Sequence, residues 1–229
     1  MKDYKVPEIN IVEDKRLRRI HLTVHPQEGV IVRVPVGTSV RDAHRVVARN
    51  SRWMQEQWTK SSHVCPWREY RDGDLLPLLG KRVVLVRENS TSPGGNWQPG
   101  CVVVKAPAQT GRSEVRQLLS DLYRLKAEEY IPGRIRTINK EHFQVELGKI
   151  SVRGQSKILG SCTGNGNLSF NWRLMLAPAA IVDYVIVHEL AHRIEMNHSP
   201  RFWHLVSSAC PEYALHRQWI RNNSNWLYI

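Results

Sequence analysis

The stretch from Pro178 to His204 constrains the fold more than any other part of the chain. It contains the pattern H-E-x-x-H at His188, Glu189 and His192. On an α-helix, residues four apart lie on one face about one turn apart, so both imidazoles can reach a single ion. Glu189 then lies about 100° round the helix from His188, where its carboxylate can hold a water molecule. The stretch therefore predicts a helix that carries a metal site.

The same stretch predicts a helix independently of this motif. Pro178 suits the first helical position, where the N–H that proline lacks has no partner in any case. From Ala179 to Met196 the run contains no Gly or Pro. Its first turns are apolar on nearly every face, which is typical of a buried helix. Histidines and a carboxylate in such surroundings destabilise the fold unless they are paired or bind a metal.

A third histidine follows the motif. His198 comes six residues after His192, and on a continuous helix it would point away from the other two. We therefore predict that the helix ends near Asn197, which can adopt the left-handed conformation. A new helix would follow, with Ser199 as its N-cap and Pro200 at its first position. Three protein ligands with an open fourth position are typical of a catalytic zinc site.

Chance is a weak explanation for this arrangement, because H-E-x-x-H is expected in roughly a few per cent of chains with these His and Glu frequencies. The predicted metal ligands are His188, His192 and His198. His204 and Glu212 are further candidate ligands, since some sites of this kind take a later carboxylate. One zinc ion is the first choice because the ligands are imidazoles, and other divalent metals are compatible with the same set.

The run H-E-L-A-H-R-I-E-M-N-H-S-P-R-F-W resembles the signature of the YgjP-like metal-dependent hydrolases, relatives of the SprT-like zinc metallopeptidases. The spacing also matches the metzincins. Those proteins carry Gly where this chain has Glu195, and no methionine follows His198 to form their Met-turn. The resemblance to the YgjP-like family implies a zincin-like fold, zinc on the three histidines, and Glu189 as the catalytic base.

A second segment is similar to the family pattern Q-x-x-R-W-G-S-C. Four residues match it: Gln155, Gly160, Ser161 and Cys162. Ile158 and Leu159 stand in place of its Arg and Trp, although Lys157 can supply a neighbouring charge. Cys162 is expected to be a small packed residue and not a nucleophile, because nothing in the sequence would lower its pKa.

The length of 229 residues suits one large domain or two small ones. We predict an α+β fold in two parts. Residues 1–110 would form a β-rich N-terminal lobe with one long helix. Residues 111–229 would form a zincin-like catalytic domain, a small sheet with the active-site helix. The boundary is placed where Pro107 and Gly111 separate a strand pattern from a helix pattern.

Alternating apolar residues predict the strands. Residues 8–35 are typical of a β-meander, and further strands are predicted at Lys81–Arg87, Cys101–Lys105, Ile150–Arg153 and Leu168–Leu176. The segment from Asn89 to Gly100, rich in Ser, Pro, Gly and Asn, predicts a loop. Leu168–Leu176 is either a core strand or an edge strand that can pair with an extended substrate.

Three further helices are predicted. Ser39 would cap a helix over 39–60, with a packed stripe and an opposite row of arginines that is either solvated or in contact with phosphate. The stripe is Val40, Ala43, Val47, Met54 and Trp58, and the row is Arg41, Arg45, Arg49 and Arg52. The second helix would begin at Ser113 and run to about Tyr130, with Pro132 and Gly133 kinking or restarting it toward His142. The third, Pro211–Asn222, would pack through Tyr213, Leu215, Trp219 and Ile220.

The net charge of +12 is spread along the chain. Residues 1–110 carry 18 basic and 11 acidic side chains, and residues 111–229 carry 15 and 10. A basic surface attracts polyanions, so weak binding of nucleic acid is compatible with it. No apolar run approaches the ~20 residues of a membrane span, and no signal-peptide core is present, which favours a cytoplasmic protein without a membrane partner. The four dispersed cysteines are expected to be reduced thiols.

These features leave three functions open. The first is a zinc-dependent, metallopeptidase-like hydrolase in which Glu189 is the general base for a metal-activated water and the substrate is a peptide or protein. The second is a nucleoside triphosphate (UTP-type) pyrophosphohydrolase on the same site, favoured by the positive charge and by the link of YgjP-like proteins to nucleotide hydrolysis. The third is a metal-stabilised nucleic-acid-binding protein. Candidate oxyanion partners are Arg201, His204 and Tyr213.

Overall fold

The computed structural model describes residues 9–25, 29–56, 70–154 and 158–223. The chain divides into two compact units, residues 1–68 with 228–229 and residues 69–227. Each unit is described by itself below. Both combine helices with small sheets, so the fold is α+β as predicted.

The first unit contains a three-stranded sheet in the order β1-β3-β2, with β1 at Ile9–Glu13, β2 at His21–His25 and β3 at Gly29–Val34. β2 pairs with β3 in the antiparallel sense, whereas β1 pairs with β3 in parallel. The predicted β-meander is therefore wrong for its first strand, because a meander joins neighbouring strands only in the antiparallel sense. Apolar alternation predicts strands but not their partners.

Helix α1, Val40–Arg49, belongs to the same unit, and residues 51–56 are helical again after a turn at Asn50. The Ser39 hydroxyl caps α1 by accepting a hydrogen bond from the Asp42 backbone N–H at 3.1 Å, as predicted. Three residues of the predicted stripe are buried with the sheet, namely Ala43, Val47 and Met54. Val40 is 64% exposed, so its predicted packing is wrong. Trp58 lies outside the described residues.

The arginines predicted to share one face of this helical region are all exposed, at positions 41, 45, 49 and 52. Arg45 forms an ion pair with Asp42 at 3.0 Å, and Arg52 forms one with Glu56 at 3.3 Å. These acidic partners reduce the net positive charge of the face. Contact of this face with phosphate therefore stays a prediction.

The second unit begins with a four-stranded sheet in the order β4-β5-β7-β6. Its strands are β4 (Leu75–Leu78), β5 (Lys81–Asn89), β6 (Gly94–Gln98) and β7 (Cys101–Ala106). The strands predicted within β5 and β7 are confirmed. The predicted loop from Asn89 to Gly100 is wrong over β6, which pairs with β7 although its Gly-rich sequence has low strand propensity.

Helix α3, Arg112–Ile138, is one continuous helix, followed by the π-helix η1 at Asn139–Phe143. The predicted restart of the helix at Pro132 and Gly133 is therefore wrong, and the neighbouring Ile131 and Ile135 are fully buried. The alternative of a kink at Pro132 stays a prediction. Its N-cap is Gly111, whose N–H donates to the Glu114 carboxylate at 2.9 Å, and not Ser113 as predicted.

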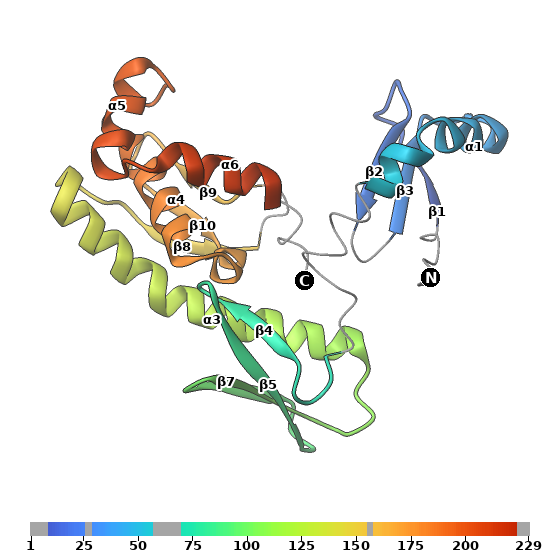
Figure 1. Cartoon of the computed structure of the whole chain (residues 1–229), viewed down its shortest axis with the longest axis horizontal. Coiled ribbons are helices and arrows are strands. Elements are labelled where there is room, and N and C mark those ends of the chain that lie inside the picture. Colours follow the sequence, from blue (N-terminus) through green and yellow to red (C-terminus); the bar gives the residue numbers. More distant parts are fainter. Residues whose placement is uncertain (1–8, 26–28, 57–69, 155–157, 224–229) are drawn as a thin grey trace. The chain divides into compact units, whose positions relative to one another are not determined.

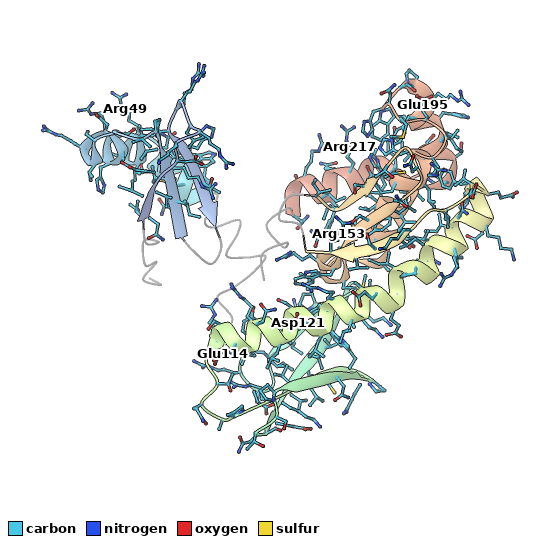
Figure 2. All side chains as sticks on the ribbon, turned by 180° about the vertical axis from the view of Figure 1, so that it is seen from behind. Arg49, Glu114, Asp121, Arg153, Glu195 and Arg217 are labelled. Atoms are coloured by element: carbon cyan, nitrogen blue, oxygen red, sulfur yellow. The ribbon has the colours of Figure 1, made fainter. Side chains whose placement is uncertain are left out.

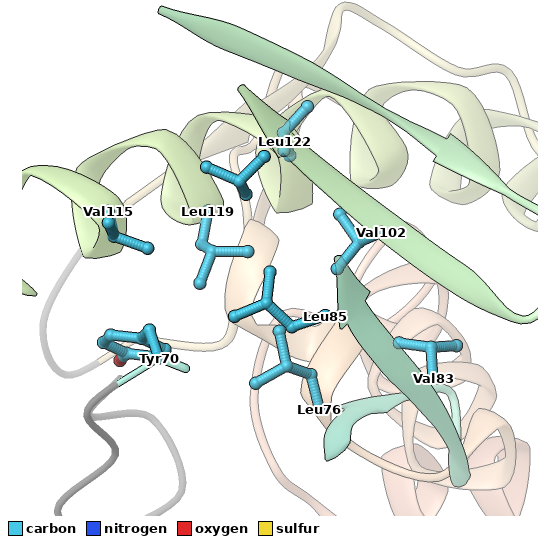
Figure 3. Packing of buried hydrophobic residues seen from close by; sticks show 9 residues of the cluster. Tyr70, Leu76, Val83, Leu85, Val102, Val115, Leu119 and Leu122 are labelled. Carbon is cyan, nitrogen blue, oxygen red and sulfur yellow. The ribbon is translucent and has the colours of Figure 1, made fainter. Parts of the chain in front are cut away.

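One apolar core joins this sheet to the start of α3 (Figure 3). Leu85 and Val102 from the sheet lie near Leu119 and Leu122 from the helix. The predicted boundary between residues 110 and 111 falls inside this unit, between β7 and α3. It stays a prediction about which segments fold on their own.

A second sheet of this unit has the order β8-β10-β9, with β8 at Ile150–Arg153, β9 at Gly160–Cys162 and β10 at Leu168–Asn171. β10 pairs in parallel with β8 and antiparallel with β9. The predicted extent of the strand Leu168–Leu176 is wrong, because it ends at Asn171, where the 3-10 helix η2 (Trp172–Leu176) begins. Of the two roles left open for it, β10 has that of the core strand, since it lies at the centre of the sheet and β8 and β9 form the two edges.

Three helices complete the unit: α4 (Ala179–Ala191), α5 (Pro200–Ala209) and α6 (Tyr213–Asn223). Figure 1 shows α3 as the long helix between the β4–β7 sheet and the layer that holds α4 and the β8–β10 sheet. The helix predicted at Pro211–Asn222 is present as α6, but Leu215 is 63% exposed, so its predicted packing role is wrong.

Candidate metal centre

The centre is built on α4, whose residues Ile181 to Ala191 are mostly buried on all faces. Pro178 is the N-cap of this helix, with φ −54° and ψ 145°, and not its first helical residue as predicted. The helix ends at Ala191, earlier than the predicted Met196. Beyond the C-cap His192, the chain leaves the α-helix through hydrogen bonds that span three residues, from the Arg193 N–H to the Leu190 carbonyl and from the Ile194 N–H to the Ala191 carbonyl, both at 3.0 Å.

The turn after α4 differs from the predicted one. Among the described non-glycine residues, only Tyr70, Leu79 and Gln144 have a positive φ. Asn197 is therefore not left-handed, and the prediction that it ends the helix in that conformation is wrong. The start of α5 is confirmed, because the Ser199 hydroxyl accepts from the Phe202 N–H at 3.3 Å and Pro200 is the first residue of the helix.

The structure brings His188, His192 and His198 together. Their candidate ligand atoms all lie within 4.8 Å of one another, and the Nε2 atoms of His188 and His198 are 3.1 Å apart. Zinc with Zn–N bonds of ~2.0–2.1 Å and tetrahedral geometry places two nitrogens about 3.4 Å apart. The three rings surround Phe202, with ring centroids 4.5 to 5.0 Å from its own. The donor set therefore fits a tetrahedral metal ion with small side-chain adjustments.

The charge states of the rings favour a cation. Burial, with smaller contributions from the two neighbouring histidines and Arg217, lowers the pKa of His188 to about 4. Burial also lowers the pKa of His192. Both imidazoles are therefore neutral at pH 7, with lone pairs free to bind metal. His198 is exposed, so the cluster is open to solvent on that side.

Glu189 lies on the same helix beside the edge strand β9. It is 6% exposed, and a Cβ atom on Gly160 would lie 2.7 Å from its Oε1 and 2.8 Å from its Cγ. Burial raises the pKa of Glu189 to about 7. A carboxyl group with a pKa near neutrality can both accept and return a proton at neutral pH.

Other predicted residues lie outside the cluster. Of the His, Cys, Asp and Glu side chains in the described part of the chain, only the three histidines form such a group, so His204 and Glu212 are not brought to it. Burial raises the pKa of the Cys162 thiol, which argues against a nucleophilic role. Cys101, Cys162 and Cys210 are free thiols, as predicted. Cys65, Gln155 and Lys157 lie outside the described residues.

The sequence did not predict a cluster of three side chains next to the histidines, formed by Trp203, Tyr213 and Arg217. The ring of Trp203 stacks on that of His198 at 5.7 Å and on that of Tyr213 at 5.5 Å. The guanidinium carbon of Arg217 lies 4.9 Å from the centroid of the Trp203 ring. Of the predicted oxyanion partners, Tyr213 belongs to this cluster of three side chains. Trp203 is the last residue of the run that resembles the family signature, and this was the only sequence feature that pointed to it; no sequence feature pointed to Arg217.

The sequence model of one protein family, described as YgjP-like, metallopeptidase domain, matches residues 18–223. Neither a curated protein nor a solved structure matches the chain. None of the helices in the described residues is long and apolar enough to cross a membrane. A domain of the metallopeptidase type implies a divalent metal, with which the three-histidine cluster is compatible. Because the match covers most of its length, the chain belongs to the YgjP-like metallopeptidase family and is a metal-dependent hydrolase.

Proposed function

We propose that this protein is a zinc-dependent peptidase that hydrolyses peptide bonds at the three-histidine cluster. The observation that carries the proposal is the convergence of His188, His192 and His198 in a chain of the metallopeptidase type, with Glu189 directly after His188 on α4. The three histidines would hold the ion, and the solvent-exposed side at His198 would leave room for substrate. A bound zinc ion supplies a water of lowered pKa and polarises the carbonyl under attack.

Glu189 would be the general base. Its carboxylate takes the proton of the attacking water and gives it to the leaving amine. Its burial against Gly160 supports this role, because it raises the pKa toward the value at which both transfers are efficient.

The edge strand β9 would bind the substrate backbone. The Leu159 carbonyl accepts from the Asn171 N–H at 2.8 Å, and the Thr163 N–H donates to the Asn167 carbonyl at 3.0 Å, so these residues face β10. Because backbone groups alternate in direction along a strand, Gly160 and Cys162 turn theirs to the open edge. An extended peptide can add there as a further strand, next to Glu189. This role replaces the one predicted for Leu168–Leu176.

Glu189→Gln tests the assignment of the base. We expect this variant to retain its metal and to lose activity by a factor of about 10² to 10⁴, because no group then accepts the proton. Elemental analysis measures the metal and turnover of a casein-type substrate measures the rate. His198→Ala is the companion variant, and we expect it to lose most of the bound metal. Full activity of Glu189→Gln removes this residue from the mechanism.

The same assay separates the candidate functions. Purified protein with zinc or magnesium is offered a casein-type substrate and UTP. Cleavage of the protein substrate supports the peptidase. Cleavage of UTP alone supports the nucleotide pyrophosphohydrolase, and retention by DNA without turnover of either substrate supports the nucleic-acid-binding protein.

A further inference from the structure

The guanidinium of Arg217 lies over the ring of Trp203, next to the metal cluster. Arg217 projects from α6 (Figure 2), and its guanidinium carbon lies 4.9 Å from the centroid of the Trp203 ring. The same indole stacks on His198 with an interplanar angle of 29°. A single ring therefore links the guanidinium to a candidate metal ligand.

The positive charge of Arg217 is available to a ligand. The residue is exposed, and in the described part of the chain no carboxylate lies within ion-pair distance of it. Other arginines are neutralised, such as Arg134, which donates two 2.9 Å hydrogen bonds to Asp183.

The geometry also defines the kind of group that would bind. A guanidinium held over an aromatic face keeps its N–H donors in the plane of the group, pointing outward at its edge. That fork matches the two oxygens of a carboxylate. The indole fixes the position of the guanidinium, so less side-chain entropy is lost when an anion binds.

We propose that Arg217 is a substrate-binding residue that accepts a carboxylate of the peptide being cleaved. The inference rests on the proposed peptidase function and adds a preference to it. The carboxylate is either the side chain of an Asp or Glu near the scissile bond or the C-terminus of the peptide. Removal of a hydrogen bond to a charged partner weakens binding by about tenfold to a hundredfold.

A binding experiment tests the inference without turnover. Zinc-loaded Glu189→Gln protein is titrated calorimetrically with matched peptides that differ in one group: Glu against Gln at successive positions, and a free C-terminus against an amide. We expect one acidic member to bind about ten to a hundred times more tightly than its neutral partner. When Arg217→Gln is combined with Glu189→Gln, the acidic and the neutral peptide should bind equally tightly. Arg221→Gln, an exposed arginine one turn further along α6, is the matched control and should preserve the preference for the acidic peptide.

The ratio of the affinities for the acidic and the neutral peptide distinguishes a binding role of Arg217 from a structural one. A general loss of stability would weaken the binding of both peptides alike. Arg217→Lys should restore only part of the preference, since an ammonium lacks the planar fork. Equal affinity for acidic and neutral peptides, or a preference that survives Arg217→Gln, overturns the inference. Failure of the peptidase is a separate result, in which the wild-type protein cleaves no peptide although the binding preference is present.

Phosphate is the other oxyanion that fits a guanidinium, and a second arm of the titration uses UTP. If UTP binds through Arg217 and no carboxylate peptide does, the carboxylate assignment is wrong.

The preference for the acidic peptide should fall as the salt concentration is raised. The pair of Arg217 and the peptide carboxylate is exposed, so salt screens its attraction.

Discussion

Gly160 and Glu189 form a close contact between the edge strand and the helix of the metal cluster. A methyl group at position 160 would lie 2.7 Å from the Glu189 Oε1 and 3.0 Å from the Val185 Cγ1. The first distance, like the 2.8 Å to the Glu189 Cγ, is shorter than a Cβ atom tolerates, so either the Glu189 side chain or the strand has to shift. A shift of this kind would move the proposed general base relative to the metal.

Gly160→Ala is therefore expected to lower kcat at least about tenfold and to destabilise the fold by about 1–3 kcal/mol through overpacking. The three histidines should still bind metal. Turnover, thermal unfolding and metal content are the measurements. Gly164→Ala is the matched control, since nothing lies within 4 Å of its added Cβ. Wild-type kcat in Gly160→Ala would show that this contact does not position Glu189.

The raised pKa of Glu189 has a consequence for the metal-free protein. Its pKa rises from an ordinary value of 4.5 to about 7 on folding. Between these values the folded chain keeps the proton and the unfolded chain releases it, so the carboxyl group destabilises the fold increasingly as the pH rises. The neutral amide of Glu189→Gln removes this effect.

With the metal chelated, we expect Glu189→Gln to be equal to wild type near pH 4 and more stable by up to about 3 kcal/mol above pH 7. Urea unfolding across this range measures the difference. If the difference in unfolding free energy between the two proteins is the same at every pH, the raised pKa of Glu189 is contradicted. The low pKa of His188 is common to both proteins and cancels in the comparison.

The histidines and the base could be predicted because their spacing depends on one helix and the turn after it. Gly160 matched a family pattern, but its contact with Glu189 depends on how β9 packs against α4. Arg217 lies on a helix that follows the motif, and nothing in the local sequence indicates that it reaches Trp203. Side chains that meet through tertiary packing leave no local pattern in the sequence.

Among the elements, α3 is held to the first sheet of its unit through Tyr123. The Tyr123 hydroxyl donates a 2.5 Å hydrogen bond to the carbonyl of Pro77 in β4. Its ring contacts Trp97 at 5.0 Å and Trp172 at 6.2 Å. Only 1% of its surface is exposed. Tyr123 therefore links the helix to the sheet and to η2.

We expect Tyr123→Phe to destabilise the protein by about 1–2 kcal/mol, because the buried carbonyl loses a donor while the ring packing is kept. Chemical denaturation measures the change. Tyr130→Phe on the same helix is the control and should have a smaller effect, since its hydroxyl makes no such hydrogen bond to any residue that the structure describes and it is only partly buried. Equal effects of the two variants would show that the bond to Pro77 adds no stability.

The elements with a strong local pattern were predicted well. β5, β7 and the start of α5 follow from apolar alternation and from the Ser-Pro cap. β6 was missed because its strand is imposed by pairing with β7, and the restart predicted at Pro132 is absent because buried isoleucines on either side hold α3 together. The position of β10 at the centre of its sheet depends on long-range pairing, which alternation does not encode.

For the whole molecule, the two compact units suggest a test by truncation. We expect residues 69–229 to fold cooperatively and to bind metal, since they contain the β4–β7 sheet, α3 and the three histidines. A fragment of residues 111–229 would expose Val115, Leu119 and Leu122, which the sheet otherwise covers. Circular dichroism and metal content are compared for both fragments. Cooperative folding of the shorter one would support the boundary predicted between residues 110 and 111.

The order of the segments along the chain also bears on how the hydrolytic centre arises during synthesis. All three histidines fall within residues 188–198, whereas the β4–β7 sheet and α3 are complete by residue 138. A nascent chain leaves the ribosome from its N-terminal end, so the supporting scaffold can assemble before any ligand for the ion has been translated. Because the ligands are so near one another in the chain, the ion closes only a short loop when it is captured. The centre would thus stay inert until its scaffold has been translated and then form in a single step.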